Sequence, residues 1–221
     1  MQKVELVAMD LDGTLLNDRK DLQIIIRTLF KYKELIQMNN MGTQEIQTDR
    51  LLLRKIKESD CHDLYKFTVK EEVAKYVSWT VHESIDVTRD LCKMWEEAYQ
   101  KEHTYRWAVV YHNTVIGVID VIRLVNASAY MGWMLDSIYW NKGFMTEAAT
   151  AVRDYLFEQV QVDTIYAAHI TENIGSGRVM QKIGMQPVSC EEYFSACDKE
   201  PKHELNGMPV SFYKMDRTDL V

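Results

Sequence analysis

The sequence predicts an α/β (α+β) fold: a mixed, mostly antiparallel central sheet flanked by helices, with a strand–helix appendage at the N-terminus. Three observations predict this class. Apolar runs of strand-like and helix-like spacing follow one another through residues 44–221. Two strand-like runs in this region are joined across a turn of hairpin type, so they are expected to pair antiparallel. A polar, glycine-containing break at residues 38–42 separates this region from the residues before it.

The composition is that of a globular protein without a nucleic-acid or membrane partner. The chain has 221 residues, 47% of them apolar, which allows a sizeable core. Its formal net charge of -7 disfavours nucleic acid, because phosphate binding needs a basic face, and favours a cationic amine or basic peptide. No apolar run approaches the roughly 20 residues of a membrane span. Glu5 and Asp10 fall where a signal peptide would be apolar.

The cysteines indicate a reduced protein in the cytoplasm. None of the four stands in a C-x-x-C pair, so neither a redox motif nor a metal site is predicted from them. A monomer or homodimer is the expected state. The cysteines are Cys61, Cys92, Cys190 and Cys197.

The first residues carry a motif of a different kind. Residues 3–9 form a mostly apolar run that stops at Asp10-Leu11-Asp12-Gly13, which is typical of a buried strand presenting two carboxylates. Residues 21–37 are expected to form one helix. The segment resembles the start of a haloacid-dehalogenase-like (HAD) hydrolase. The resemblance implies Asp10 as nucleophile on phosphorus and Asp12 as general acid/base, with Mg²⁺ nearby.

That motif lacks the rest of its site. The HAD family also needs a Ser or Thr, a Lys and a later acidic pair, and these do not follow, so phosphatase activity is not expected. We interpret residues 1–37 as a truncated HAD-like strand–helix fragment, residues 38–43 as a linker and residues 44–221 as the main domain.

The main domain is expected to begin with a strand and two helices. Residues 46–56 are interpreted as one strand, followed by a helix from Glu58 that Ser59 or Asp60 can cap. A second helix is expected over residues 87–100. Its core-facing residues are predicted from helical spacing to be Leu91, Met94, Trp95 and Ala98.

Three strands are expected next, the first two forming a hairpin. Residues 105–111 and 115–124 are joined across His112-Asn113-Thr114, a turn of hairpin type. Residues 129–135 form the third strand.

The remaining elements alternate between helix and strand. A loop leads into a helix expected over residues 146–159, and residues 164–171 form another strand. Residues 173–185 are predicted to be a capped helix with Gly184 at its left-handed C-terminus. A last strand is expected around residues 210–215.

Three motifs in this order resemble the GCN5-related N-acetyltransferases (GNAT), closest to the RimJ/RimL-type branch that acetylates ribosomal proteins. They are Thr48-Asp49-Arg50-Leu51-Leu52-Leu53-Arg54, Trp140-Asn141-Lys142-Gly143-Phe144-Met145-Thr146-Glu147-Ala148, and the residues from Asn173 to Met185. The resemblance covers residues 44–220. It implies the GNAT fold, acetyl-CoA as co-substrate and transfer of the acetyl group to a primary amine.

The resemblance implies that the second motif binds the diphosphate of acetyl-CoA. Backbone N–H groups at a helix N-terminus suit an anion, and glycine lets the backbone approach closely. The sequence departs from the family at two positions: Trp140 stands where Gln or Arg is common, and Met145 where Gly or Ala is usual. The implied diphosphate-binding residues are Asn141, Lys142, Gly143, Phe144, Met145 and Thr146.

The resemblance also implies where the rest of the cofactor lies. Met134 and Leu135 would offer backbone groups to the pantetheine arm where two strands splay apart. The Asn173 side chain would bond the arm, and Arg178 would reach a phosphate. Ser176 would start its helix, either only as a cap or also as the hydroxyl that protonates the leaving thiolate.

The general base is left open by the sequence. The ribosomal-protein branch often carries a Glu after the Gly-aromatic pair, and here Gln186 follows Gly184-Met185 instead. Glu147 is better placed to interact with its helix dipole. The remaining candidates are His169, Glu172, Glu191 and Glu192. Aromatic candidates for the acceptor side are Tyr76, Trp79, Trp107, Trp133 and Tyr139.

The function expected from these residues is an acetyl-CoA-dependent N-acetyltransferase acting by direct attack in a ternary complex. The acceptor would be a peptide N-terminus or a small-molecule amine. The alternative is a non-catalytic CoA-binding or interaction domain.

Overall fold

The computed structural model describes residues 39, 41–101, 103–197 and 199–220. These residues belong to one compact unit. The predicted HAD-like strand and helix, with Asp10 and Asp12, lie outside the described residues, as do two positions of the expected linker. That part of the prediction therefore stays a prediction.

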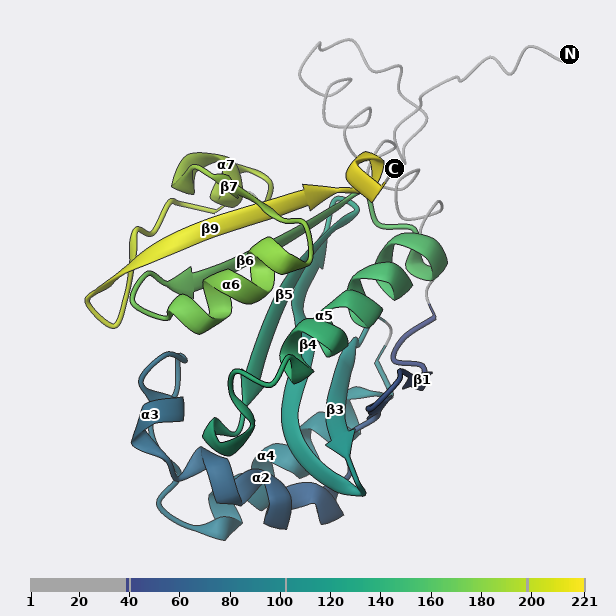
Figure 1. The fold of residues 1–221 in the computed structure, drawn as a ribbon, viewed down its shortest axis with the longest axis vertical. Helices are drawn as coiled ribbons and strands as arrows, with labels where there is room; N and C mark the ends of the chain where they lie inside the picture. Colours follow the sequence, from purple (N-terminus) through teal and green to yellow (C-terminus); the bar gives the residue numbers. More distant parts are fainter. Residues whose placement is uncertain (1–38, 40, 102, 198, 221) are drawn as a thin grey trace, which may run out of the picture. The chain divides into compact units, whose positions relative to one another are not determined.

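The described strands build one twisted sheet in the order β1-β2-β3-β4-β5-β6-β9-β7, with β8 paired to β9 (Figure 1). In the described part of the chain every strand pairing is antiparallel except that of β5 with β6. The mixed, mostly antiparallel sheet that the sequence predicts is confirmed. The strands are β1 (Ile46–Gln47), β2 (Leu52–Arg54), β3 (Arg106–Tyr111), β4 (Thr114–Val125), β5 (Ser128–Leu135), β6 (Thr164–Ile170), β7 (Gln186–Val188), β8 (Glu204–Leu205) and β9 (Met208–Asp216).

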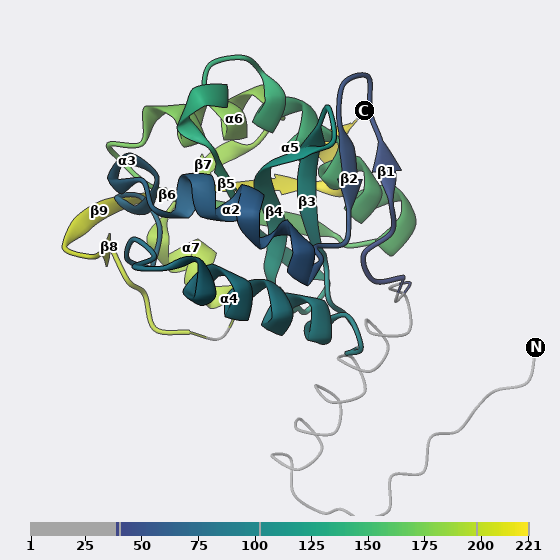
Figure 2. The same ribbon diagram turned by 90° about the horizontal axis from the view of Figure 1, so that it is seen from below.

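Helices cover both faces of the sheet. Seen along its edge, α5 and α6 lie on one face and α2, α4 and α7 on the other (Figure 2). No helix in the described part of the chain is both long and apolar enough to cross a membrane. The helices are α2 (Cys61–Thr68), α3 (Glu71–Ala74), α4 (Ile85–Ala98), α5 (Phe144–Tyr155), α6 (Ile174–Lys182) and α7 (Cys190–Ser195), with short segments η1 (Glu58–Asp60), η2 (Ser137–Tyr139), η3 (Leu156–Val160, a π-turn) and η4 (Arg217–Leu220).

The single strand predicted over residues 46–56 is instead a hairpin. β1 and β2 pair antiparallel, with Ile46 opposite Leu53. Thr48 closes the turn, because its N–H donates to Leu51 O at 2.9 Å and its Oγ1 accepts from Leu51 N at 3.0 Å. A threonine hydroxyl that bonds nearby backbone favours a turn over a continuous strand. The bend brings the polar turn to the surface beside α5.

The predicted core face of the second helix needs one correction. α4 buries Thr88 and Cys92, whereas the side chain of Met94 is on the exposed side, 56% accessible. Thr88 can be buried because its hydroxyl is hydrogen-bonded: its Oγ1 lies 3.2 Å from Thr68 Oγ1, and either hydroxyl can be the donor. Helical spacing alone does not reveal that a hydroxyl pair can be buried.

Several predicted turns and ends are confirmed. His112 and Asn113 both have positive φ, 45° and 61°, which is the two-residue hairpin geometry between β3 and β4. Gly184 ends α6 with φ 93°. Gly184 N–H bonds to Gln181 O at 3.1 Å and Met185 N–H to Met180 O at 3.0 Å, a Schellman motif.

The feature that positions the site is the short parallel pairing of β5 with β6. It joins Ser128–Met131 to Thr164–Ala167 and stops there. Beyond it, the ends of β5 and β6 run apart, with α5 and α6 in front of the opening (Figure 1). Among the described residues, the second half of β5 therefore keeps one edge without a strand partner.

A substitution of Gly117 in β4 tests how closely the backbone of β4 packs against the end of β5. A Cβ at this position would lie 2.5 Å from the backbone oxygen of Met134 and 3.2 Å from the Leu135 Cα. We expect Gly117→Ala to lower the free energy of unfolding by about 1–3 kcal/mol, because backbone rather than a flexible side chain must move. Denaturant unfolding measures it. Gly132→Ala in the neighbouring strand β5 is the control, since the nearest atom to its added Cβ is a side-chain atom, Asp120 Oδ1 at 3.4 Å, and its backbone is not left-handed; an equal loss in both variants would contradict the argument.

Candidate active site

Three backbone N–H groups stand free at the N-terminus of α5. Gly143 is the N-cap with φ 80°, and the first helical bond runs from Glu147 N–H to Gly143 O at 3.0 Å. The N–H groups of Phe144, Met145 and Thr146 therefore have no acceptor within the helix. Such groups, with the positive end of the helix dipole, suit an anion. The helix begins two residues earlier than predicted, because Gly143 makes the turn.

Met145 does not narrow the approach to these amides. Its side chain and that of Phe144 are both 5% accessible and belong to the main core beneath α5. Only their backbone groups remain at the surface. The departure from the family's small residue is thus accommodated inside the protein.

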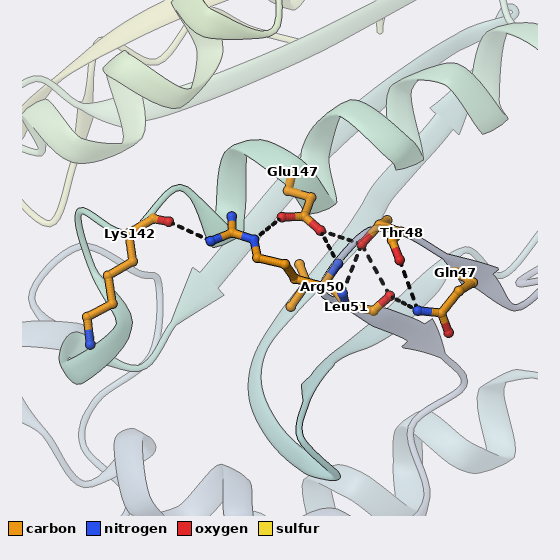
Figure 3. Close-up of polar contacts among 6 residues, drawn as sticks. All are labelled: Gln47, Thr48, Arg50, Leu51, Lys142 and Glu147. Carbon is orange, nitrogen blue, oxygen red and sulfur yellow. Dashed lines mark hydrogen bonds and ion pairs between the residues drawn. The ribbon is translucent and has the colours of Figure 1, made fainter.

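The turn between β1 and β2 is tied to α5 through Glu147 (Figure 3). Glu147 Oε1 accepts from Thr48 Oγ1 at 2.6 Å and from Arg50 N–H at 2.9 Å, and Oε2 accepts from Arg50 Nε at 2.6 Å. Arg50 Nη1 also donates to Lys142 O at 3.1 Å. The residues come from segments about a hundred positions apart in the chain, which is why sequence spacing gave Arg50 no role.

This network removes Glu147 from the candidates for a base. Burial acts to raise the pKa of Glu147, but hydrogen bonds from Thr48 and Arg50 and the Arg50 charge outweigh it, and the net pKa is lowered. A carboxylate with a lowered pKa and three donors is a poor proton acceptor. Its position in the first turn of α5 also suits the helix dipole, as predicted.

Lys142 takes part in this network through its backbone carbonyl and not through its charged side chain. Its Nζ lies 5.5 Å from the centroid of the Tyr139 ring, and Figure 3 shows the side chain extending away from the pair of Arg50 and Glu147. Lys142 and its neighbour Asn141, which has φ 60°, are exposed. Its carbonyl is the group that Arg50 holds.

Of the two β5 residues expected to meet the pantetheine arm, Leu135 faces the opening and Met134 does not. Asp136 N–H bonds to Ile116 O of β4 at 2.8 Å. Since backbone groups alternate along a strand, those of Met134 also point to β4, while those of Leu135 point to the β6 side. Leu135 O there accepts from Trp140 Nε1 at 2.8 Å. The prediction for Met134 is thus corrected by the strand register.

Asn173, not Ser176, caps α6. Asn173 Oδ1 accepts from Ser176 N–H at 3.1 Å, so the oxygen of the side chain that was expected to bond the cofactor arm already serves the helix. Ser176 lies in the first turn, half-buried, and Arg178 is exposed two residues further on. The first turn of α6 borders the opening between β5 and β6 on the side opposite α5 (Figure 1).

His169 is half-buried beneath that turn. Its Nδ1 lies 2.8 Å from Ile170 O, whereas Nε2 is buried and packs against Gly177, where a Cβ would come to 2.8 Å. Burial lowers the pKa of His169, and the bond to Ile170 only partly opposes this. A ring nitrogen closed off in this way cannot accept a proton from a substrate without movement of α6.

The other base candidates stand in surface ion pairs. Glu172 Oε2 lies 3.2 Å from Lys75 Nζ, and Glu192 Oε1 lies 2.7 Å from Lys214 Nζ. Glu191 is 3.9 Å from His203. These positions leave the choice of base among them open.

A second polar network holds the end of β5 from the opposite face, and sequence reasoning missed it. Asp136 Oδ1 accepts from Lys70 Nζ at 2.5 Å, and both side chains are largely buried. Ser137 Oγ accepts from Lys70 and donates to Glu72 Oε1 at 2.9 Å. The turn between α2 and α3 is thereby fastened beside Leu135.

Only some of the candidate aromatics approach this region. Trp107 is fully buried and donates to Gln44 O at 2.7 Å, so it is core. Tyr139 packs on Phe144, with ring centroids 5.8 Å apart. Tyr76, Trp79 and Trp133 are half-buried.

Comparison with known proteins gives a consistent result. Residues 50–186 match the family model described as an acetyltransferase (GNAT) domain. The chain is 31% identical over 155 residues to the uncharacterized N-acetyltransferase YnaD of Bacillus subtilis, covering 69% of this chain and 86% of that protein. It is 28% identical over 147 residues to the uncharacterized N-acetyltransferase p20 of Bacillus licheniformis, covering 65% and 83%.

Solved structures share the fold. A GNAT-family acetyltransferase from Bacillus anthracis matches with a TM-score of 0.64 at 24% identity, covering 79% of this chain and 99% of that one. RimL, a ribosomal L7/L12 alpha-N-protein acetyltransferase in complex with coenzyme A, matches with a TM-score of 0.65 at 20% identity, covering 78% and 98%. The microcin C7 self-immunity acetyltransferase MccE, with acetyl-CoA and AMP, matches with 0.64 at 19%, covering 82% and 99%.

Burial of His169 predicts a pH dependence of stability. Because the pKa is lowered in the folded state, the unfolded chain takes up a proton at higher pH than the folded chain does. The free energy of unfolding should therefore fall as pH drops below about 6.5, the ordinary histidine value. We expect a smaller fall between pH 7 and pH 5 in His169→Asn, measured by denaturant unfolding. Burial also lowers the pKa of His82, and this histidine contributes equally to the fall in stability of both proteins. Equal falls in wild type and variant would contradict the assignment.

Proposed function

The chain belongs to the acetyltransferase (GNAT) family, and from that premise we propose how its residues bind acetyl-CoA and transfer the acetyl group to a primary amine. It is an acyltransferase with acetyl-CoA as its co-substrate. The observation that carries the proposal is the meeting of two backbone features: the free N–H groups of α5 and the unpaired edge of β5.

The diphosphate of acetyl-CoA is proposed to bind at the start of α5. The N–H groups of Phe144, Met145 and Thr146 supply donors, and Gly143 leaves room for close approach. Asn141 and Lys142 line the same turn. Arg178, exposed on α6, is available to a phosphate across the opening.

The pantetheine arm is proposed to run along β5 toward the opening. Leu135 presents its N–H on that edge, and an extended amide chain pairs with such a group as an added strand does. The Leu135 carbonyl is engaged by Trp140. Asn173 contributes its remaining amide nitrogen from the other side. The thioester then lies near the first turn of α6.

The reaction needs a neutral amine. Its nitrogen attacks the thioester carbonyl, a C–N bond forms and the C–S bond breaks, and the nitrogen gives up a proton to water or to a carboxylate at the opening. A backbone N–H on β5 polarises the carbonyl. Ser176, the hydroxyl in the first turn of α6, is proposed to give its proton to the leaving thiolate and to take one back from water, so that it ends the step protonated.

The acceptor is proposed to be a peptide N-terminus or a small-molecule amine. RimL, similar in fold, is named for acetylating a ribosomal protein, and MccE is named with AMP beside acetyl-CoA. The net charge of -7 favours a cationic acceptor. We propose a cytoplasmic location, in keeping with the free cysteines Cys61, Cys92, Cys190 and Cys197. A monomer or homodimer is expected.

Binding of acetyl-CoA tests the diphosphate site. Calorimetric titration should give a dissociation constant on the order of micromolar, in the range of many enzyme substrates. Gly143→Trp should weaken it at least about tenfold, which equals about 1.4 kcal/mol, because an indole at a left-handed position covers the amides. Gly207→Trp is the matched control, since Gly207 also has positive φ, 72°, but lies in another turn. No binding by the wild-type chain would sink the proposal.

Ser176→Ala tests the proton donor. We expect kcat for transfer to fall by roughly a hundredfold, the scale of one general acid, while the affinity for acetyl-CoA is kept. Steady-state kinetics with an amine acceptor and calorimetry measure the two quantities. Ser176→Thr, which keeps a hydroxyl, should retain more activity than Ser176→Ala. An unchanged kcat in Ser176→Ala would leave Ser176 with a structural role only.

A further inference from the structure

We propose that Arg50, oriented by Glu147, is a positioning residue that fixes the loop before α5 so that the free N–H groups of the helix converge on the cofactor diphosphate. The inference rests on the proposed function, since it concerns how the same site is held. Arg50 comes from the turn between β1 and β2, whereas the rest of the site is built by β5, α5 and α6.

The guanidinium of Arg50 lies against four residues of the loop and helix. Its Nε donates to Glu147 at 2.6 Å and its Nη1 to Lys142 O at 3.1 Å. Its Cζ lies 4.4 Å from the centroid of the Phe144 ring, and its Nη2 faces Gly143, where a Cβ would come to 3.5 Å. One planar group therefore contacts the loop before, at and after the N-cap.

The loop needs such support because its backbone is unusual. Asn141 has φ 60° and Gly143 has φ 80°, two left-handed residues within three positions, and both are exposed. A non-glycine residue in this region is held there by its surroundings. The bond from Arg50 to Lys142 O fixes the peptide between the two. Without it, the loop can leave the conformation that directs the amides outward.

Glu147 holds the Arg50 side chain in one orientation. The carboxylate binds Arg50 at both its backbone N–H and its Nε, and binds Thr48 of the same turn (Figure 3). Glu147 is the less exposed partner, with a side chain 18% accessible against 43% for Arg50. The ion pair is complete without any ligand. Arg50 is therefore placed to hold the loop, with its charge already matched by a carboxylate.

The test compares two donors that differ in the 3′-phospho-ADP part, which contains the diphosphate. Acetyl-CoA carries this part, and S-acetylpantetheine lacks it. For Arg50→Ala we expect the dissociation constant of acetyl-CoA to rise by roughly ten- to a hundredfold, the scale of a misplaced binding group, while that of S-acetylpantetheine changes by less than about twofold. Glu147→Gln should act in the same direction. Titration followed by NMR measures both constants, including weak ones.

Arg50→Lys separates positioning from charge. Lysine keeps the positive charge but lacks the planar fork that reaches Glu147 and Lys142 O together. We expect Arg50→Lys to bind acetyl-CoA nearly as weakly as Arg50→Ala does. If lysine restores the affinity, Arg50 acts as a charge for the phosphates, and the positioning role is wrong.

Hydrogen exchange of the protein without ligand gives an independent readout. Peptides covering residues 139–147 should exchange faster in Arg50→Ala, with β3 and β4 unchanged. Arg217→Ala is the matched control: Arg217 is 42% accessible and bonds Asp163 at 2.7 Å and Gln161 at 2.8 Å, beyond the other end of α5. It should leave both donors and the loop unaffected. Equal losses in both arginine variants, or for both donors, would overturn the proposal.

The result is distinguishable from failure of the proposed function. If the wild-type chain binds neither donor, the proposed function fails. If it binds acetyl-CoA and Arg50→Ala binds it equally well with unchanged exchange in residues 139–147, only the role of Arg50 fails.

Discussion

The parallel pairing of β5 with β6 is the constraint on which the site depends. Two parallel strands must be joined by a crossover, and here the crossover contains α5, whose N-terminus consequently follows the C-terminal end of β5. Because the pairing covers only Ser128–Met131, the rest of β5 has an open edge. The connection between these two strands thus brings together the N–H groups of α5, which can donate hydrogen bonds to an anion, and the unpaired edge of β5.

The surrounding elements hold this opening from three sides. The β1–β2 turn reaches α5 through Arg50 and Glu147. The turn between α2 and α3 reaches the end of β5 through Lys70 and Asp136. Asn173 fixes the start of α6. Each contact uses a polar group that would be costly to leave unpaired, so the site's borders are set by hydrogen bonds rather than by apolar packing alone.

Packing decides which groups remain available for chemistry. Phe144 and Met145 send their side chains into the core and leave only their amides outside. His169, which by sequence is a candidate base, is closed off beneath Gly177. Glu147 is consumed by the ion pair with Arg50. Some polar residues near the opening, such as His169 and Glu147, are therefore not available to accept a proton from a substrate.

The amino-acid sequence alone was enough to predict the order of the elements from β3 to α6, the turn between β3 and β4, the C-terminal glycine of α6 and the loop that leads into α5. These are local matters, fixed by residues within a few positions of one another, such as the Asn-containing turn at His112 or Gly184 after its helix. Only the tertiary structure decided that residues 46–56 bend into a hairpin, that Met134 faces β4 while Leu135 faces the opening, that Met94 lies outside, and that Arg50 reaches the α5 loop. The physical reason is that each of these depends on partners distant in the chain: strand register, a buried hydroxyl pair and an ion pair across about a hundred residues leave no periodic trace in the sequence.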